Sequence, residues 1–507
     1  MAKDSQKNFE NFLETSKNLA LVSSTVTLLN WDQETYMPPG GIDARSAQIA
    51  LLTSYIHKER TSPSYKKALS SLIHLSSGKY VGNKLNPVQK VALREWRHDF
   101  LRDNKLPNSF VKSFAELTST STCAWSKAKK NRSFKEFAPY LKKIVEMVRE
   151  KADILGYKKH PYDALIDLHE KGMTAEKLDH LFAGLKKALQ PLLKKVTSKK
   201  GPDDSFLYGE FPPEKQREFG KKLIHLLGTD PHHFRLDESA HPFSLAVHPS
   251  DVRITTRILP DSVMSNILAI LHECGHAFYE MGLPKEYFGS PICEAASLGI
   301  HESQSRWWET RIGRSKGFWK FLLPHLQKEF PEKLKKVPFD TFYKGLHVVT
   351  PSFIRIEADE MTYSLHVILR YELEKALLTK EIKVEDLPSA WNELSKKLLG
   401  ITPKHDGEGC LQDIHWSMGE LGYFPTYTLG NLYASHFFTT FAKDHPDWET
   451  RLQKGEFDFV LDWLKKHIHQ YGRTYAPEEL AVKVTGKPLT EKAYVDYLTE
   501  KYSEIYA

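Results

Sequence analysis

Apolar residues recur at three- and four-residue intervals over most of this 507-residue chain, which is the spacing of an α-helix that buries one face. The pattern is clear from Phe9 to Leu29 and stops before the segment Pro38 to Gly41, because proline lacks an amide donor and glycine frees the backbone. Similar patterns cover residues 43–78, 86–104, 134–154, 175–197, 213–227, 363–379 and 427–442. The sequence therefore predicts a mainly α fold.

One segment alternates like a β-strand instead. Residues 243–247 and 252–256 read as two short strands on either side of a turn formed by His248, Pro249, Ser250 and Asp251. We therefore expect a small antiparallel sheet directly before the next helix, with an edge that could hold an extended peptide by strand addition.

The length alone would allow several domains. The best linker candidate, the polar segment 198–205, is too short to define a boundary, and no repeat of fixed period is present. The simplest prediction is a single domain over residues 1–507, with an N-terminal helical part (about 1–200), a central core (about 206–440) and C-terminal helices (441–507).

Composition excludes several classes of protein. The chain holds 71 Lys and Arg against 64 Asp and Glu, a net charge of +7 that is small for its length, and no basic run is combined with aromatic platforms as nucleic-acid binding favours. The four cysteines form no CxxC pair, and we find neither a signal peptide nor a long apolar run. We expect a cytoplasmic protein that binds neither nucleic acid nor membrane.

The segment 261–282 predicts a helix that contains the sequence HExxH. His272 and His276 are four residues apart, so both imidazoles project from one face and can bind the same tetrahedral metal ion. Glu273 lies beside them and is a candidate general base. The alternative is a pair of histidines in the core or on the surface without a metal, but a buried helix with this set of polar groups needs a partner for them.

A catalytic zinc ion usually has three protein ligands. The three-histidine pattern HExxHxxGxxH is absent, since Ala277 and Phe278 follow His276. A carboxylate on the next predicted helix, residues 294–312, is the expected substitute, and the candidates are Glu294, Glu302 and Glu309. Each could equally be an ordinary soluble residue of that helix, and the spacing leaves the choice open.

Several further segments occur in a recognisable order. They are Trp31–Pro38 (WDQETYMP), His241–Phe243 (HPF), Asp251–Thr255 (DVRIT), His272–His276 (HECGH), His301–Gln304 (HESQ), Ile354–Asp359 (IRIEAD) and Gly409–Trp416 (GCLQDIHW). Through them the chain resembles the carboxypeptidase Taq family of metallopeptidases from near its N-terminus to beyond residue 435.

The resemblance implies that the glutamate of HESQ, Glu302, is the third metal ligand. It also implies one Zn²⁺ per chain, for which Co²⁺ or Mn²⁺ could substitute, a single helical domain with a deep groove, and a homodimer. The chain departs from the family pattern at His436, where the family has glutamine, and at Thr310, where it has asparagine. Both positions lie outside the metal set, so they bear on fine specificity.

The activity implied is the release of C-terminal amino acids from peptides with a free C-terminus, with Glu273 as general base. Oxyanion stabilisation needs a donor on the opposite wall, and His415, Tyr423 and Tyr427 are candidates that could equally be packed aromatic residues.

A substrate carboxylate needs a fixed cation, for which the planar fork of arginine is well suited. Arg253 and Arg355 are the candidates, joined by His241 of the HPF segment as a substrate-binding residue. Arg355 could instead form a structural salt bridge with Asp359 one turn on. Asp359 and Asp413 could also orient the ligand imidazoles.

Two other functions compete with this one. An oligoendopeptidase can share the histidines, the glutamate base and the helical groove. A zinc-stabilised binding protein without activity is the rival from a different class, but a structural site has no need of Glu273.

Overall fold

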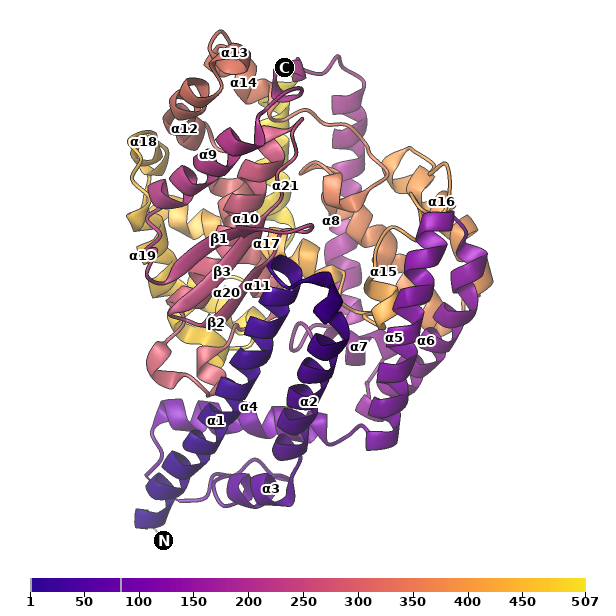
Figure 1. The fold of residues 1–507 in the computed structure, drawn as a ribbon, viewed down its shortest axis with the longest axis vertical. Helices are drawn as coiled ribbons and strands as arrows, with labels where there is room; N and C mark the ends of the chain where they lie inside the picture. Colours follow the sequence, from indigo (N-terminus) through magenta and orange to yellow (C-terminus); the bar gives the residue numbers. More distant parts are fainter. Residues whose placement is uncertain (1, 83) are drawn as a thin grey trace.

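The computed structural model describes residues 2–82 and 84–507 and consists mainly of helices (Figure 1), so the predicted fold class is confirmed. The first helices are α1 (Ala2–Thr35), α2 (Ile42–Arg60), α3 (Pro63–Ser70), α4 (Pro87–Asp103), α5 (Asn108–Asn131), α6 (Phe134–Leu155), α7 (Pro161–Ile166), α8 (Ala175–Thr197) and α9 (Pro213–Leu226). The strands β1 (Phe234–Glu238), β2 (Ser244–His248) and β3 (Asp251–Thr256) then precede α10 (Val263–Gly282).

The remaining helices follow the central one. They are α11 (Leu298–Arg306), α12 (Lys316–Glu329), α13 (Pro331–Leu334), α14 (Phe339–Gly345), α15 (Tyr363–Thr379), α16 (Leu387–Leu399), α17 (Pro425–Asp444), α18 (Trp448–Gln453), α19 (Asp458–His467), α20 (Pro477–Thr485) and α21 (Lys492–Ile505). A π-helix, η5 (Trp307–Ile312), continues α11. Short 3₁₀ turns are η1 (Pro39–Gly41), η2 (Ser205–Leu207), η3 (Lys285–Tyr287), η4 (Pro291–Cys293), η6 (Arg355–Glu357), η7 (Val384–Asp386), η8 (His415–Met418) and η9 (His469–Thr474).

The helical segment predicted over 43–78 is two helices, and the reason is local. Ser62 has an extended backbone, and its hydroxyl accepts a hydrogen bond from the amide of Tyr65 at 3.1 Å, which caps α3. Pro63 follows at the first position of α3, where its missing N–H costs nothing. Serine and proline at this point therefore end one helix and begin another.

The sheet contains the predicted hairpin and one strand that the sequence did not reveal. β2 pairs antiparallel with β3, while β1 pairs parallel with the other edge of β3. The sheet is therefore mixed rather than purely antiparallel. β1 was missed because its sequence, Phe-Arg-Leu-Asp-Glu, is short and mostly charged, although Phe234 and Asp237 are buried.

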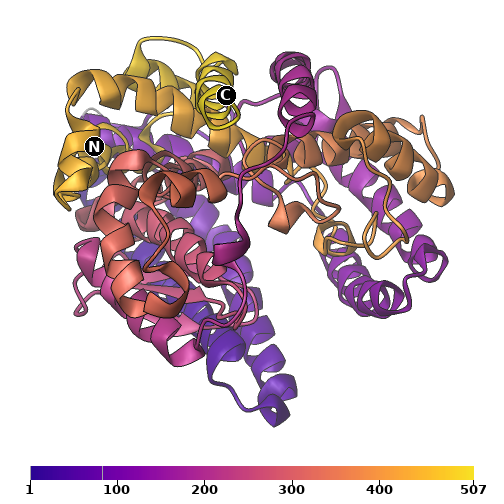
Figure 2. The same cartoon turned by 90° about the horizontal axis from the view of Figure 1, so that it is seen from above.

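The buried apolar side chains form two clusters. The larger one draws on residues from Ala128 to Tyr506, and the smaller one joins α1, α3 and α4 through residues such as Phe12, Leu69 and Trp96. Figure 2 shows that the helices fall into two groups, one around α10 and the sheet and the other around α5, α6, α15 and α16. The single-domain prediction stays a prediction.

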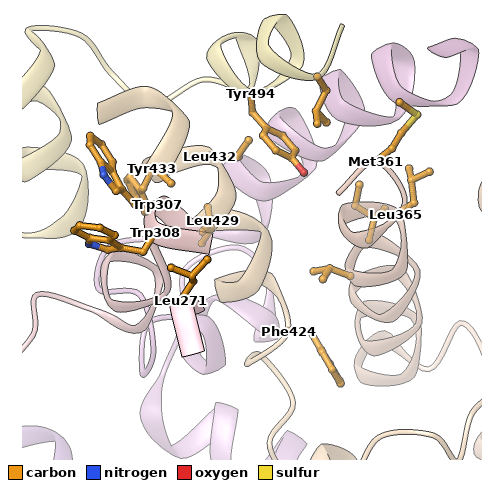
Figure 3. Packing of buried hydrophobic residues seen from close by; sticks show 14 of the residues in the cluster. Leu271, Trp307, Trp308, Met361, Leu365, Phe424, Leu429, Leu432, Tyr433 and Tyr494 are labelled. Carbon is orange, nitrogen blue, oxygen red and sulfur yellow. The ribbon is translucent and has the colours of Figure 1, made fainter. Parts of the chain in front are cut away.

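Three helices approach one another very closely at the centre of the fold. A Cβ atom on Gly275 of α10 would lie 2.3 Å from the carbonyl oxygen of Gln304 in α11. A Cβ atom on Gly430 of α17 would lie 2.3 Å from Cγ of Glu302. Figure 3 shows the packing around this junction, where Trp307 and Trp308 lie near Leu429 and Tyr433 of α17. Glycine therefore lets α11 fit between α10 and α17.

Among the residues whose placement is described, no helix combines the length and the apolar character needed to span a lipid bilayer.

We expect Gly275→Ala to destabilise the protein by about 1–3 kcal/mol or more, because the added methyl group meets backbone atoms that cannot rotate away. Thermal unfolding of the two proteins measures this effect. Gly40→Ala is the matched control, since nothing lies within 4 Å of a Cβ atom there. Equal melting temperatures for the two variants would contradict the close approach of α10 and α11.

Candidate metal centre and active site

His272, His276 and Glu302 converge at the junction of α10 and α11. One ligand atom from each residue lies within 4.8 Å of the others. Oε2 of Glu302 is 3.7 Å from Nε2 of His272 and 3.4 Å from Nε2 of His276. A tetrahedral zinc ion with bonds of about 2.0–2.1 Å holds its ligand atoms roughly 3.3–3.4 Å apart, so both distances from Glu302 are close to those of a zinc site.

Each imidazole is held in orientation through its other ring nitrogen. Oε2 of Glu309 lies 2.8 Å from Nδ1 of His272, and the carbonyl oxygen of His301 lies 3.1 Å from Nδ1 of His276. An acceptor at Nδ1 places the proton there and leaves the lone pair on Nε2, which faces Glu302. His301 also stacks on His276 at 4.5 Å, while its Nε2 contacts Oε1 of Glu280 at 2.9 Å.

The other carboxylates considered as ligands lie elsewhere. Glu294 is paired with Arg473 at 2.7 Å, and Glu309 contacts the nitrogen of His272 that faces away from Glu302. Glu302 itself accepts a hydrogen bond from the hydroxyl of Ser305 at 2.9 Å. Of the three candidates, Glu302 is the one that the structure brings into the cluster.

Burial and charge shift the pKa values in this cluster in different directions. Burial lowers the pKa of His272, but the carboxylates of Glu302 and Glu309 overcome this and raise it to about 9. Burial also lowers the pKa of His276, here to about 4. Glu302 has a pKa below its usual 4.5, because the two imidazoles outweigh the effect of its burial.

Glu273 is buried beside the three donors, with an exposed fraction of 6%. Burial raises the pKa of its carboxyl to about 7, and the neighbouring carboxylate of Glu302 adds to that shift. A carboxyl group whose pKa lies near neutrality can both accept and return a proton.

These observations fit a divalent metal ion. Two imidazole nitrogens with oriented lone pairs and a buried carboxylate form the mixed nitrogen and oxygen donor set that zinc prefers. Three donors also leave a fourth coordination position for water or substrate, as catalytic zinc sites do.

His415, Tyr423 and Tyr427 form an aromatic cluster. Nε2 of His415 is 3.1 Å from the hydroxyl of Tyr427, and Nδ1 of His415 is buried without a hydrogen-bond partner in the structure. Burial lowers the pKa of His415 to about 4, so the ring is neutral near pH 7. Tyr427 lies one turn before Gly430, which contacts Glu302. The structure therefore brings these three predicted residues together on the α17 side of the cluster.

Arg355 lies close to Tyr427 and is nearly fully buried. Its guanidinium carbon is 4.7 Å from the centre of the Tyr427 ring, and its Nη1 donates to the hydroxyl of Tyr363 at 3.2 Å. Its salt bridge is with Asp413, at 3.0 Å, rather than with Asp359. The Arg355–Asp359 alternative was wrong because Asp359 instead accepts hydrogen bonds from the backbone amides of residues 350, 361 and 362.

Arg253 and His241 lie at the sheet. Arg253 forms a bidentate pair with Asp251, at 2.8 Å for both hydrogen bonds, and its guanidinium lies 4.5 Å from the centre of the Trp31 ring in α1. His241 is exposed, and its carbonyl oxygen accepts a hydrogen bond from Ser239. These contacts join α1 to the sheet, and a substrate-binding role for either residue stays a prediction.

The two departures from the family pattern pack away from the metal donors. His436 contacts the hydroxyl of Thr485 at 2.9 Å, and the hydroxyl of Thr310 donates to the carbonyl oxygen of Arg306 at 2.6 Å.

Sequence reasoning missed what Glu309 does. The sequence predicts Glu309 as one of three possible ligands, and Asp359 and Asp413 as residues that could orient imidazoles. In the structure, Glu309 is the residue that contacts His272. The available signal was its position, seven residues after Glu302 and thus two turns along the same helix face. The π-helix η5, which carries Glu309, could not be read from the sequence.

A mainly helical fold with an HExxH helix, a nearby glutamate donor and a buried carboxyl group beside them defines a metallopeptidase. Known proteins agree with that class. The model of the family described as carboxypeptidase Taq (M32) metallopeptidase matches residues 11–502. Carboxypeptidase 1 of Bacillus subtilis is 39% identical over 98% of both chains. Thermostable carboxypeptidase 1 of Thermus thermophilus is 40% identical over 98% of this chain and 99% of its own.

The fold agrees as well. The crystal structure of an M32 carboxypeptidase from Deinococcus radiodurans R1 has a TM-score of 0.95 at 34% identity and covers 99% of both chains. The chain belongs to the carboxypeptidase Taq (M32) family of metallopeptidases, and it is a metallocarboxypeptidase.

We expect Glu309→Gln to weaken Zn²⁺ binding about 10- to 100-fold, because the amide no longer fixes the His272 ring as a charged acceptor. Competition with a zinc chelator measures the affinity. Glu294→Gln is the control, since Glu294 is paired with Arg473 and lies outside the donor cluster. Unchanged affinity in Glu309→Gln would exclude an orienting role.

The buried carboxyl group of Glu374 should make the free energy of unfolding depend on pH. Glu374 is fully buried in α15, where it accepts hydrogen bonds from Tyr162, Trp416 and the amide of Gly422. Burial raises its pKa from 4.5 to about 7. The folded protein therefore holds this proton more tightly than the unfolded chain, and the resulting stability, present below pH 4.5, is lost as the pH rises to about 7.

Glutamine has no proton to lose in this range, so Glu374→Gln should not show this loss of stability. The free energy of unfolding of the variant, relative to that of the wild type, should therefore rise by up to about 3 kcal/mol between pH 4.5 and pH 7. Thermal unfolding from pH 4.5 to pH 7.5 measures the difference. The exposed Glu393 on α16 provides the control variant Glu393→Gln, and a parallel pH profile for wild type and Glu374→Gln would contradict the argument.

Proposed function

We propose that this protein releases C-terminal amino acids from peptides, with Zn²⁺ held by His272, His276 and Glu302 and with Glu273 as the general base. The observation that carries the proposal is the buried carboxyl group of Glu273 directly beside three converging metal donors. The relatives named carboxypeptidases support the same reaction.

The chemistry follows from the positions of the protein groups. Zn²⁺ bound at the three donors supplies Lewis acidity, which activates water and polarises the scissile carbonyl. Glu273 takes a proton from the attacking water and passes it to the nitrogen of the leaving amino acid. Its pKa near 7 suits both transfers, because the group is neither a very weak base nor a very weak acid at neutral pH.

Charge developing on the carbonyl oxygen needs a hydrogen-bond donor. The hydroxyl of Tyr427 is the candidate that the contacts favour, since it bonds to His415 at 3.1 Å and lies one turn from the residue that packs on Glu302. Tyr423 is the alternative donor in the same aromatic cluster.

Arg355 is the proposed receptor for the free carboxylate of the substrate. Its guanidinium lies against the ring of Tyr427, so it is close to the proposed oxyanion donor. Asp413 occupies the side of the guanidinium formed by Nε and Nη2, and Nη1 donates to Tyr363. The edge formed by Nη1 and Nη2 is therefore the one that would hold the carboxylate and fix the last residue of the peptide in one position. That fixed position would set the cleavage one residue from the C-terminus.

The metal donors and the general base would also serve an oligoendopeptidase, but the relatives named carboxypeptidases favour the release of C-terminal residues. Co²⁺ or Mn²⁺ could replace Zn²⁺ with the same ligands. The cytoplasmic location and the homodimer stay predictions.

We expect mass spectrometry of a short peptide with a blocked N-terminus to show stepwise loss of single C-terminal residues. Glu273→Gln should lower kcat by a factor of about 10²–10⁴, because the general base is lost. Chelated enzyme should be inactive and should recover when zinc is restored.

Zinc content and melting temperature of Glu273→Gln serve as controls, since this residue is outside the donor set. Internal fragments would favour the endopeptidase. Absence of cleavage by folded, zinc-loaded wild type across varied peptides would point to a binding protein without activity.

A further inference from the structure

Two buried arginines share a single carboxylate beside the proposed substrate receptor. Oδ1 of Asp413 accepts hydrogen bonds from Nε of Arg355 at 3.1 Å and from Nη2 at 3.0 Å. Oδ2 of the same residue accepts from Nε of Arg370 at 2.7 Å and lies 2.6 Å from its Nη2. Each oxygen of Asp413 is therefore occupied by one arginine.

Arg370 comes from α15 and is completely buried, whereas the side chain of Arg355 keeps an exposed fraction of 7%. The guanidinium of Arg370 lies over the rings of Trp391 at 4.7 Å and Phe424 at 5.3 Å. Arg370 thus lies behind Asp413, and Arg355 is the member of the cluster that solvent or a substrate can reach.

The charges in this cluster do not cancel. Two guanidinium groups and one carboxylate leave a surplus of +1, and the neighbouring His366 and His415 do not change it. Burial lowers the pKa of His366 to about 3 and that of His415 to about 4, so both rings are neutral.

The nearest acid on α15 does not form a salt bridge with Arg370 either. Glu374 lies one turn further on and has its oxygens occupied by Tyr162, Trp416 and Gly422. Burial raises its pKa to about 7, so below that pH it is mainly protonated and the surplus of +1 remains. Burying a surplus charge is expensive unless a counter-ion completes the site. A carboxylate at Arg355 would complete an alternating row of two cations and two anions.

We infer that Arg370 is a specificity-determining positioning residue, which acts through Asp413 to keep Arg355 electrostatically available for the C-terminal carboxylate of the substrate. The inference deepens the proposed function and rests on it. Without Arg370, Asp413 would neutralise Arg355, and the cluster would present no net charge to the substrate. With Arg370 present, Asp413 still fixes the guanidinium of Arg355, while Arg370 balances the negative charge of Asp413.

The test compares two substrates with zinc-loaded enzyme. One is a peptide with a blocked N-terminus and a free C-terminal carboxylate, and the other is the same peptide as its C-terminal amide. The ratio of their kcat/KM values measures recognition of the carboxylate. Arg370→Met should lower this ratio roughly 10- to 100-fold, mainly through KM of the free acid, because a charge-assisted interaction is lost.

A compensating variant separates charge balance from a structural role. The double variant Arg370→Met with Asp413→Asn removes one positive and one negative charge, so the surplus of +1 returns at Arg355. We expect it to recover most of the preference for the free acid. Arg370→Lys, which keeps the charge, should recover part of it. Melting temperature and zinc content are measured for every variant.

Two outcomes would overturn the inference. One is an unchanged ratio in Arg370→Met, which includes an equal loss of activity on both substrates, and the other is a folded double variant that does not recover the preference. If Arg370→Met does not fold, the ratio of kcat/KM values is measured for Arg370→Lys and the double variant instead, with the same criteria. If the wild type itself makes no distinction between acid and amide, the proposed carboxylate receptor has failed rather than the role of Arg370.

Discussion

Two buried carboxyl groups and a third, half-buried one lie beside two imidazoles at the junction of α10 and α11, and this concentration of negative charge is the constraint on which the site depends. Glu273, Glu302 and Glu309 face one arginine in direct contact, Arg306, which pairs with Glu309 at 2.6 Å. Buried charges without partners cost several kcal/mol each. If both imidazoles are neutral as metal ligands, Arg306 is the one cation in direct contact with these three acids among the described residues, and a divalent metal ion would bring the group close to neutrality.

The opposite end of the site has the reverse sign. Arg355 and Arg370 share Asp413 and leave a positive surplus, while the acids gather at the metal donors. A peptide bound as proposed, with its C-terminal carboxylate at Arg355 and its last peptide carbonyl at the metal donors, would match that polarity in one direction only. The separation of charge would therefore orient the substrate before any specific contact to its side chain is made.

The sequence predicted the features that depend on local spacing. The period of the apolar residues predicted long helices such as α4, α6 and α8 but missed α5 and most of the helices after α11, and the four-residue interval placed His272 and His276 on one face. It could not predict contacts between distant segments. β1 was missed because its pairing with β3 decides its conformation, and Arg370 was missed because its partner, Asp413, is 43 positions away. The choice of Glu302 as the third metal ligand depended on the family resemblance, because the sequence spacing favoured Glu294 and Glu309 equally.

The C-terminal helix α21 connects the two ends of the site. The hydroxyl of Tyr497 lies 2.8 Å from Oε1 of Glu360 and 3.2 Å from the carbonyl oxygen of Thr310, beside Glu309, so its one proton can be donated to either oxygen. Lys501 bonds to the other oxygen of Glu360 at 2.7 Å, and Glu360 follows closely after Arg355. One helix thus holds both the π-helix that orients His272 and the segment that carries Arg355. The proposed removal of one residue at a time would need a fixed distance between the metal and the carboxylate receptor, and a shared rigid support would supply it.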